Sequence, residues 1–215
     1  MRWRVALVIV VALILGGIAA LVISHEAGTG TYRQTEADAS ARGLAPIAFQ
    51  FDHPTKLKVT KPADAYVKVE KTPNGLLASR FTVSPFRFQP EPGLVSGYLP
   101  IVATRLEKDA TRRYKGFRLN FEGRARVNEV EGYQYAFRAQ LPREGKPDRQ
   151  LFGRVVILPQ PYDLNNPGDP YPVGRSPDRG VLITMLSTSL DTPNDPVRVG
   201  DEGALKQLFR SFRFG

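Results

Sequence analysis

The first 24 residues constrain this chain most, because a long uncharged apolar segment directly follows a basic N-terminus. The segment from Val5 to Ser24 contains thirteen Leu, Ile or Val residues, and apart from Ser24 the others are Ala and Gly. A helix rises about 1.5 Å per residue, so about 20 residues span roughly 30 Å, the thickness of a bilayer's hydrocarbon core. We therefore expect residues 1–24 to form a cytoplasmic stub and a transmembrane anchor, with the lipid bilayer as the partner of Val5–Ser24.

The charges beside this segment predict its orientation. Arg2 and Arg4 precede it, whereas His25 and Glu26 follow it. Positively charged flanks stay in the cytoplasm, so we expect a single-pass plasma-membrane protein with a cytoplasmic N-terminus and an extracytoplasmic domain. A cleaved signal peptide is the alternative. It is less favoured because such peptides have a shorter apolar region and end at a small-x-small site, which residues 22–24 match poorly.

The absence of cysteine restricts what the exported part can be. It excludes a lipidated cysteine, disulfide bonds, thiolate metal sites and thiol nucleophiles. Residues 25–44 are rich in Gly, Thr, Ala and Ser with mixed charge and no apolar period, which predicts a flexible tether. The alternative for this segment is a short helix from Glu36 to Arg42. Residues 45–215 remain for one domain held together by its hydrophobic core.

Hydrophobic periodicity in residues 45–215 predicts strands and two helices. Leu99, Val102, Leu106 and Ala110 recur at helical spacing, whereas apolar residues alternate with polar ones from Phe117 onward. Two later segments are more continuously apolar, as in central strands. The predicted strands are 49–59, 66–70, 76–88, 117–127, 133–140, 151–158 and 181–190, and the predicted helices are 96–114 and 201–210. This order predicts an α+β fold, an antiparallel β-sheet layered with helices.

Three segments of this domain resemble the PsbP-like α/β sandwich family. They are Phe51-Asp52-His53-Pro54, Gly132-Tyr133 and the closing Leu208-Phe209-Arg210-Ser211-Phe212. The resemblance covers about Ala45–Gly215, and within it the chain is similar to membrane-anchored envelope proteins of actinobacterial type. It implies a PsbP-like sandwich with a non-enzymatic binding or assembly role in the bacterial cell envelope, together with a protein partner that it does not name.

Motifs for catalysis or metal binding are incomplete. Residues 174–177 begin like a nucleophile elbow, but Asp178 replaces the final glycine. Residues 163–168 match the first half of a calcium loop, but Pro167 occupies the fifth position and Gly174 the twelfth. A hydrolase would depend on His53 and is the least favoured alternative. We therefore expect no enzyme, no cofactor and no metal site.

The loop from Pro159 to Gly180 is a candidate partner-binding segment. It joins two predicted central strands over about 20 residues and contains six prolines with Tyr162 and Tyr171. Most hairpin loops are much shorter, and long ones are usually functional or disordered. We expect the two tyrosines to contact a partner; the alternative is a mobile insertion without a role.

Positive charge gives the last candidate site. The chain has a formal charge of +9, and four basic residues share one face of the predicted 96–114 helix or follow it: Arg105, Lys108, Arg112 and Lys115. They predict binding to anionic lipid or wall polymer, the alternative being a solvated helix face. An extracytoplasmic location argues against nucleic acid. The alternative function is a binder of a small apolar, lipid-like ligand between sheet and helix, lined by Tyr133, Tyr135 and Phe137.

Overall fold

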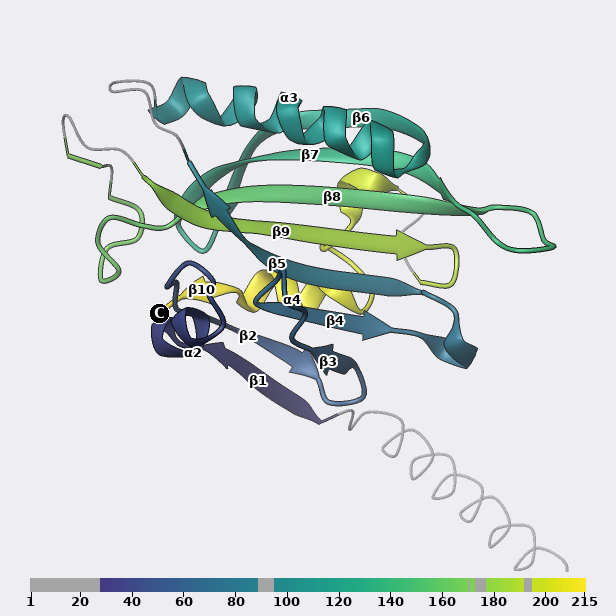
Figure 1. Ribbon diagram of the computed structural model, residues 1–215, viewed down its shortest axis with the longest axis horizontal. Coiled ribbons are helices and arrows are strands. Elements are labelled where there is room, and N and C mark those ends of the chain that lie inside the picture. Colours follow the sequence, from purple (N-terminus) through teal and green to yellow (C-terminus); the bar gives the residue numbers. More distant parts are fainter. Residues whose placement is uncertain (1–27, 89–94, 170, 173–176, 192–194) are drawn as a thin grey trace, which may run out of the picture.

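The computed structural model describes residues 28–88, 95–169, 171–172, 177–191 and 195–215 (Figure 1). The predicted anchor, Val5–Ser24, lies outside these residues. Within the described ranges, no helix is both long and apolar enough to cross a membrane.

A seven-stranded antiparallel sheet forms the centre of the molecule. Its strands, in spatial order, are β3 (Lys58–Thr60), β4 (Val67–Lys71), β5 (Ser79–Arg87), β9 (Arg179–Thr188), β8 (Arg149–Pro159), β7 (Val130–Leu141) and β6 (Lys115–Val127). The two segments predicted as central strands, 151–158 and 181–190, correspond to β8 and β9 in the interior of the sheet. Strands covered on both faces carry nearly continuous apolar residues, which explains their pattern.

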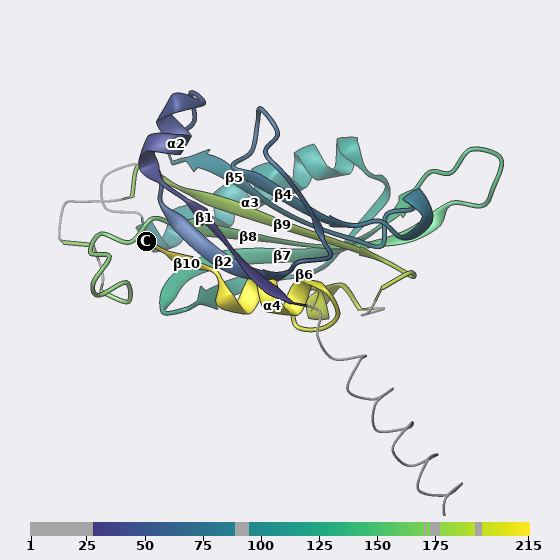
Figure 2. The ribbon, with the colours of Figure 1, turned by 90° about the horizontal axis from the view of Figure 1, so that it is seen from below.

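Different elements cover the two faces of this sheet. The helix α3 (Val95–Arg113) lies along one face, and a three-stranded sheet lies against the other together with α4 (Leu205–Ser211) (Figures 1 and 2). The small sheet has the order β1 (Thr29–Gln34), β2 (Phe49–Pro54) and β10 (Arg213–Phe214). Three short helices complete the fold: α2 (Glu36–Ala41), η1 (Pro73–Gly75) and η2 (Pro196–Arg198). The predicted α+β class with antiparallel strands layered by helices is confirmed.

The larger hydrophobic core lies between the two sheets and is rich in aromatic rings. Phe49 and Phe51 of β2 are buried with ring centroids 6.4 Å apart, and Phe51 meets Phe81 of β5 edge-on at 5.1 Å. Phe212, directly after α4, packs against Phe49 at 5.3 Å. Each buried ring contributes about 1.5–3 kcal/mol through removal of apolar surface from water. This core joins the first and last elements of the described residues to the large sheet.

The second core lies beneath α3. Val102 and Ala103 of the helix belong to the same buried cluster as Tyr135 and Phe137 of β7. The Phe137 ring also packs against Phe117 of β6 at 5.0 Å. The apolar stripe predicted for the 96–114 helix therefore faces the sheet, as its spacing indicates.

The predicted flexible tether over residues 25–44 is wrong for the part that the structure describes. Residues 29–34 form β1, which pairs with β2 from Thr29–Pro54 to Gln34–Phe49, and α2 follows. Tyr32 is 8% exposed and belongs to the main core. The alternative helix predicted from Glu36 to Arg42 matches α2, whose first turn is capped by the Thr35 hydroxyl accepting from Asp38 N at 3.1 Å. The folded unit therefore begins well before residue 45.

The alternation of apolar and polar residues in 117–127 predicts a strand with one buried face, and this prediction is wrong in part. Phe117 packs against the core beneath α3, but Leu119 is 42% and Phe121 41% exposed. The pairing of β6 with β7 shifts register between Lys115 and Arg118 and again between Leu119 and Phe121. Such irregularities turn the following side chains away from the face that strict alternation would give them.

Candidate functional site

A pocket of about 280 Å³ lies between the end of β5 and the flank of α3. Its lining residues are Phe86 and Arg87 of β5 and Tyr98, Val102, Arg105 and Leu106 of α3. The helical residues recur every three or four positions and so share one side of α3. The site therefore requires a strand end and a helix to meet.

Aromatic packing holds this end of β5 in place. Phe86 and Phe88 meet edge-on with ring centroids 4.9 Å apart, and Phe88 lies 6.5 Å from Tyr98 of α3. The backbone N–H of Phe88 donates to Asp178 O at 2.9 Å, which fixes the strand end beside the start of β9. Val102 is buried at the helix side. The pocket consequently has an apolar wall built on rigid elements.

Two guanidinium groups give the pocket its charge. Arg87 and Arg105 are exposed, and neither forms an ion pair with any carboxylate in the described part of the chain. By contrast, Arg80 on the same strand as Arg87 pairs with Glu70 at 2.7 Å. Planar guanidinium groups bind carboxylate or phosphate through paired hydrogen bonds. The arrangement suits an anion that also carries an apolar part.

The predicted basic stripe is only partly available for binding. Arg105, Lys108 and Arg112 are exposed on α3, whereas Lys115 begins β6. Arg112 Nη1 lies 3.6 Å from Asp109 Oδ1, and Lys115 Nζ lies 2.8 Å from Asp148 Oδ2. Of the four, Arg105 is the residue that lines the pocket. Arg112 and Lys115 therefore each have a carboxylate partner, and Arg105 lines the pocket. Lys108 lies between Arg105 and Arg112 on the helix.

The position of α3 separates this stripe from the N-terminal end of the described chain. The helix covers one face of the large sheet, and β1 lies on the opposite side (Figures 1 and 2). A predicted membrane anchor would enter the domain through Thr29, the first residue of β1. The fold therefore places the stripe across the molecule from the point where the predicted anchor would join the domain.

The structure brings the two predicted loop tyrosines together. Tyr162 and Tyr171 have ring centroids 5.8 Å apart, and the Tyr171 hydroxyl donates to Gln160 O. Burial raises the pKa of Tyr171 to about 12, so this hydroxyl keeps its proton at physiological pH. The loop leaves β8 and enters β9 at Arg179, which pairs in register with Arg87 of the pocket. Loop and pocket therefore share one end of the sheet.

The aromatic residues predicted to line a ligand cavity are packed in the hydrophobic core instead. Tyr135 is 3% exposed and Phe137 is fully buried, and both belong to the core beneath α3 with Tyr133 packed at its margin. Their rings fill the space between sheet and helix. The pocket lies at the flank of the helix. The apolar alternation of the 133–140 strand did not identify its lining residues, because they come from β5 and α3.

The incomplete metal-binding and catalytic motifs of the sequence involve Asp163, His53 and Ser176. In the described ranges, no group of three or more His, Asp or Glu residues is placed to hold a metal ion. Asp163 accepts from Asn165 N at 2.8 Å, as in a polar turn. His53 Nδ1 lies 3.0 Å from Pro54 O. Ser176, the nucleophile of the incomplete elbow motif, lies outside the described residues.

Solved structures include matches to this chain, whereas no family model and no curated protein matches it. The chain is similar to the solution structure of cyanobacterial PsbP (CyanoP) from Synechocystis sp. PCC 6803, with 15% identity and a TM-score of 0.46 over 88% of this chain and 94% of that one. A likeness at this identity concerns the fold alone. The resemblance to membrane-anchored actinobacterial-type proteins stays a prediction.

Proposed function

We propose that the protein is a membrane-anchored, extracytoplasmic binding module of the bacterial cell envelope, with a PsbP-like domain and no enzymatic activity. Its site is the pocket between β5 and α3, and its ligand is a small amphiphilic anion. The observation that supports this most is the pair of guanidinium groups, Arg87 and Arg105, which have no ion-pair partner among the described residues and lie beside an apolar wall. The anchor is supported by Val5–Ser24 and its flanking arginines.

An amphiphilic ligand would gain binding free energy in this pocket from two contributions. A hydrogen bond to a charged group contributes about 1.5–3 kcal/mol, more than a neutral one. Contact with Phe86 and Tyr98 removes apolar ligand surface from water at about 25 cal/mol per Å². A ligand that lacks either part loses one of the two contributions, so charge and ring together define the ligand class.

Phenyl phosphate tests this proposal because it combines an aromatic ring with an anion. Titration calorimetry of the full-length protein in nanodiscs is expected to show binding, whereas phenol shows none. Arg87→Ala and Arg105→Ala should each weaken the binding about tenfold, the effect of losing one charge-assisted hydrogen bond.

Arg112→Ala is the matched control, since Arg112 lies on the same helix but pairs with Asp109 away from the pocket. Binding that survives both pocket substitutions, or that Arg112→Ala weakens equally, would contradict the proposed site.

A second candidate, a protein-assembly module, is favoured by the exposed apolar residues of β6. This strand is an edge of the large sheet, and it presents Leu119 and Phe121 to solvent. Edge strands offer unpaired backbone groups to a partner chain. In a capture experiment with envelope extract, the double substitution Leu119→Ser with Phe121→Ser should abolish binding of the captured protein. If this variant still binds phenyl phosphate, the two sites are separate.

A further inference from the structure

We propose that the outer face of α4 binds the phosphate of an anionic phospholipid headgroup and thereby holds the domain against the membrane surface. Lys206 and Arg210 carry this site. The inference rests on the anchoring part of the proposed function, but it concerns a different face of the molecule from the pocket beside α3.

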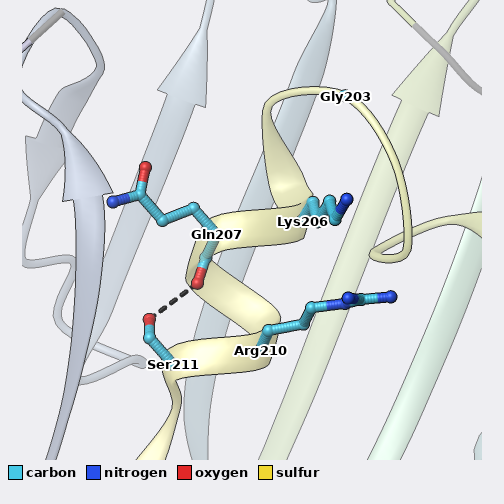
Figure 3. A pocket seen from close by; sticks show the side chains of 5 residues that line it. All are labelled: Gly203, Lys206, Gln207, Arg210 and Ser211. Atoms are coloured by element: carbon cyan, nitrogen blue, oxygen red, sulfur yellow. Dashed lines mark hydrogen bonds between the residues drawn. The ribbon is translucent and has the colours of Figure 1, made fainter.

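A shallow pocket of about 420 Å³ lies along α4. It is lined by Gly203, Lys206, Gln207, Arg210 and Ser211 (Figure 3). Lys206 and Arg210 are four residues apart, and Figure 3 shows both side chains extending to the same side of the helix. Gln207 and Ser211 lie on the other side, where the Ser211 hydroxyl donates to Gln207 O at 2.6 Å. Two cations spaced by one helical turn can contact one phosphate from adjacent directions.

The described residues do not neutralise the charge of this face. Both Lys206 and Arg210 are exposed, and within the described residues neither has an ion-pair partner. Carboxylates that precede the helix have other partners: Asp201 pairs with Arg154 at 2.8 Å, and Glu202 pairs with Arg198. The cations of α4 therefore remain available for an external anion.

The location of α4 identifies the source of that anion. Gln207 Nε2 donates to Thr29 Oγ1 at 3.2 Å, so the helix lies directly beside the first residue of β1. Four residues, 25–28, separate Thr29 from the predicted membrane segment that ends at Ser24. Fully extended, so short a connection reaches at most about 18 Å. The bilayer headgroups are consequently within reach of α4, and they are the nearest abundant phosphate groups.

The basic residues of α3 do not meet this condition, because α3 covers the opposite face of the large sheet (Figures 1 and 2). Attraction to an anionic surface falls off within a Debye length of about 8–10 Å. Lys108 and Arg112 are exposed on α3, lie four residues apart and do not line the pocket, so they are the matched control for Lys206 and Arg210.

Hydrogen–deuterium exchange of the full-length protein in nanodiscs tests the inference. Amides of residues 203–211 are expected to exchange more slowly in phosphatidylglycerol-containing discs than in phosphatidylcholine discs, by a factor of about five or greater. The reason is that each basic residue near an anionic surface strengthens association by roughly that factor. Lys206→Ala with Arg210→Ala should abolish the difference, and the charge-preserving Lys206→Arg with Arg210→Lys should retain it. Lys108→Ala with Arg112→Ala should leave it unchanged.

Three outcomes would overturn the inference. Equal exchange in the two kinds of disc would do so while leaving the anchor and the phenyl phosphate site intact. Protection by millimolar inorganic phosphate in phosphatidylcholine discs, equal to that by phosphatidylglycerol, would assign the site to free anions. Failure of the chain to insert into discs would remove the anchoring part of the proposed function as well.

Discussion

At the scale of single residues, Glu107 is held in an environment that opposes its charge. It lies on α3 and faces Glu122 of β6. Burial, and then the charge and hydrogen bond of Glu122, raise the pKa of Glu107 from 4.5 to about 7. Its Oε1 atom is buried without a hydrogen-bond partner among the described residues. The carboxyl group that joins helix to sheet is thus most stable with its proton.

This shift predicts how stability depends on pH. The folded chain holds the Glu107 proton up to pH about 7, whereas the unfolded chain releases it near 4.5, so stability is fully present below 4.5 and falls as pH rises between these values. Solvent screening keeps the loss to about 1 kcal/mol or less. Urea unfolding at pH 5 and pH 8 should show the loss in the native protein and a smaller one in Glu107→Gln. Asp109→Asn, an exposed neighbour, serves as the control, and equal pH dependence in Glu107→Gln would refute the assignment.

At the scale of elements, β1 decides whether residues 29–34 belong to the fold. The Tyr32 hydroxyl has one proton to share between two acceptors, Gln34 Oε1 at 2.9 Å and Tyr66 O at 3.1 Å, and its ring stacks on Phe51 at 5.2 Å. Tyr32→Ala should therefore lower the free energy of unfolding by about 3 kcal/mol, the usual cost of removing a buried aromatic ring.

Chemical denaturation measures this cost, with Tyr162→Ala as a control because Tyr162 is 48% exposed. If residues 29–34 were a flexible tether, Tyr32→Ala would not change the free energy of unfolding. Equal stability of the two variants would therefore support the tether and contradict a structural role of β1.

Elements with a regular apolar period were predictable from the sequence, and those with irregular or polar positions were not. Helix α3 and strands β7, β8 and β9 follow their periods and were predicted closely. Strand β1 was missed because one of its buried positions is Gln34, which satisfies its polar atoms through Tyr32 and Thr35 O. The pocket was missed except for Arg105, because Phe86 and Arg87 meet α3 only through the tertiary fold.

At the scale of the whole molecule, the large sheet belongs to both cores. Adjacent residues of β8 point to opposite faces: Val155 and Ile157 lie in the core beneath α3, and Val156 and Leu158 in the core between the sheets. Loss of one core removes support from the other. We therefore predict that the domain unfolds as one cooperative unit, and that Ile157→Ala and Val156→Ala each lower the midpoint of the whole transition.

Unfolding followed by far-ultraviolet circular dichroism and by tyrosine fluorescence should give coincident curves for both variants. Separate transitions, with each substitution shifting only one of them, would show that the two faces fold independently.

Strand β2 lies between the first and last strands of the chain. β1 pairs with one edge of it and β10 with the other, and Gly215 N donates to Ala48 O at 3.1 Å. A ribosome or a translocation channel delivers a chain from its N-terminus, so the C-terminal strand is the last to arrive. The small sheet cannot be completed until the final residues emerge. The small sheet is therefore assembled late, after the strands of the large sheet, β3 to β9, have left the ribosome.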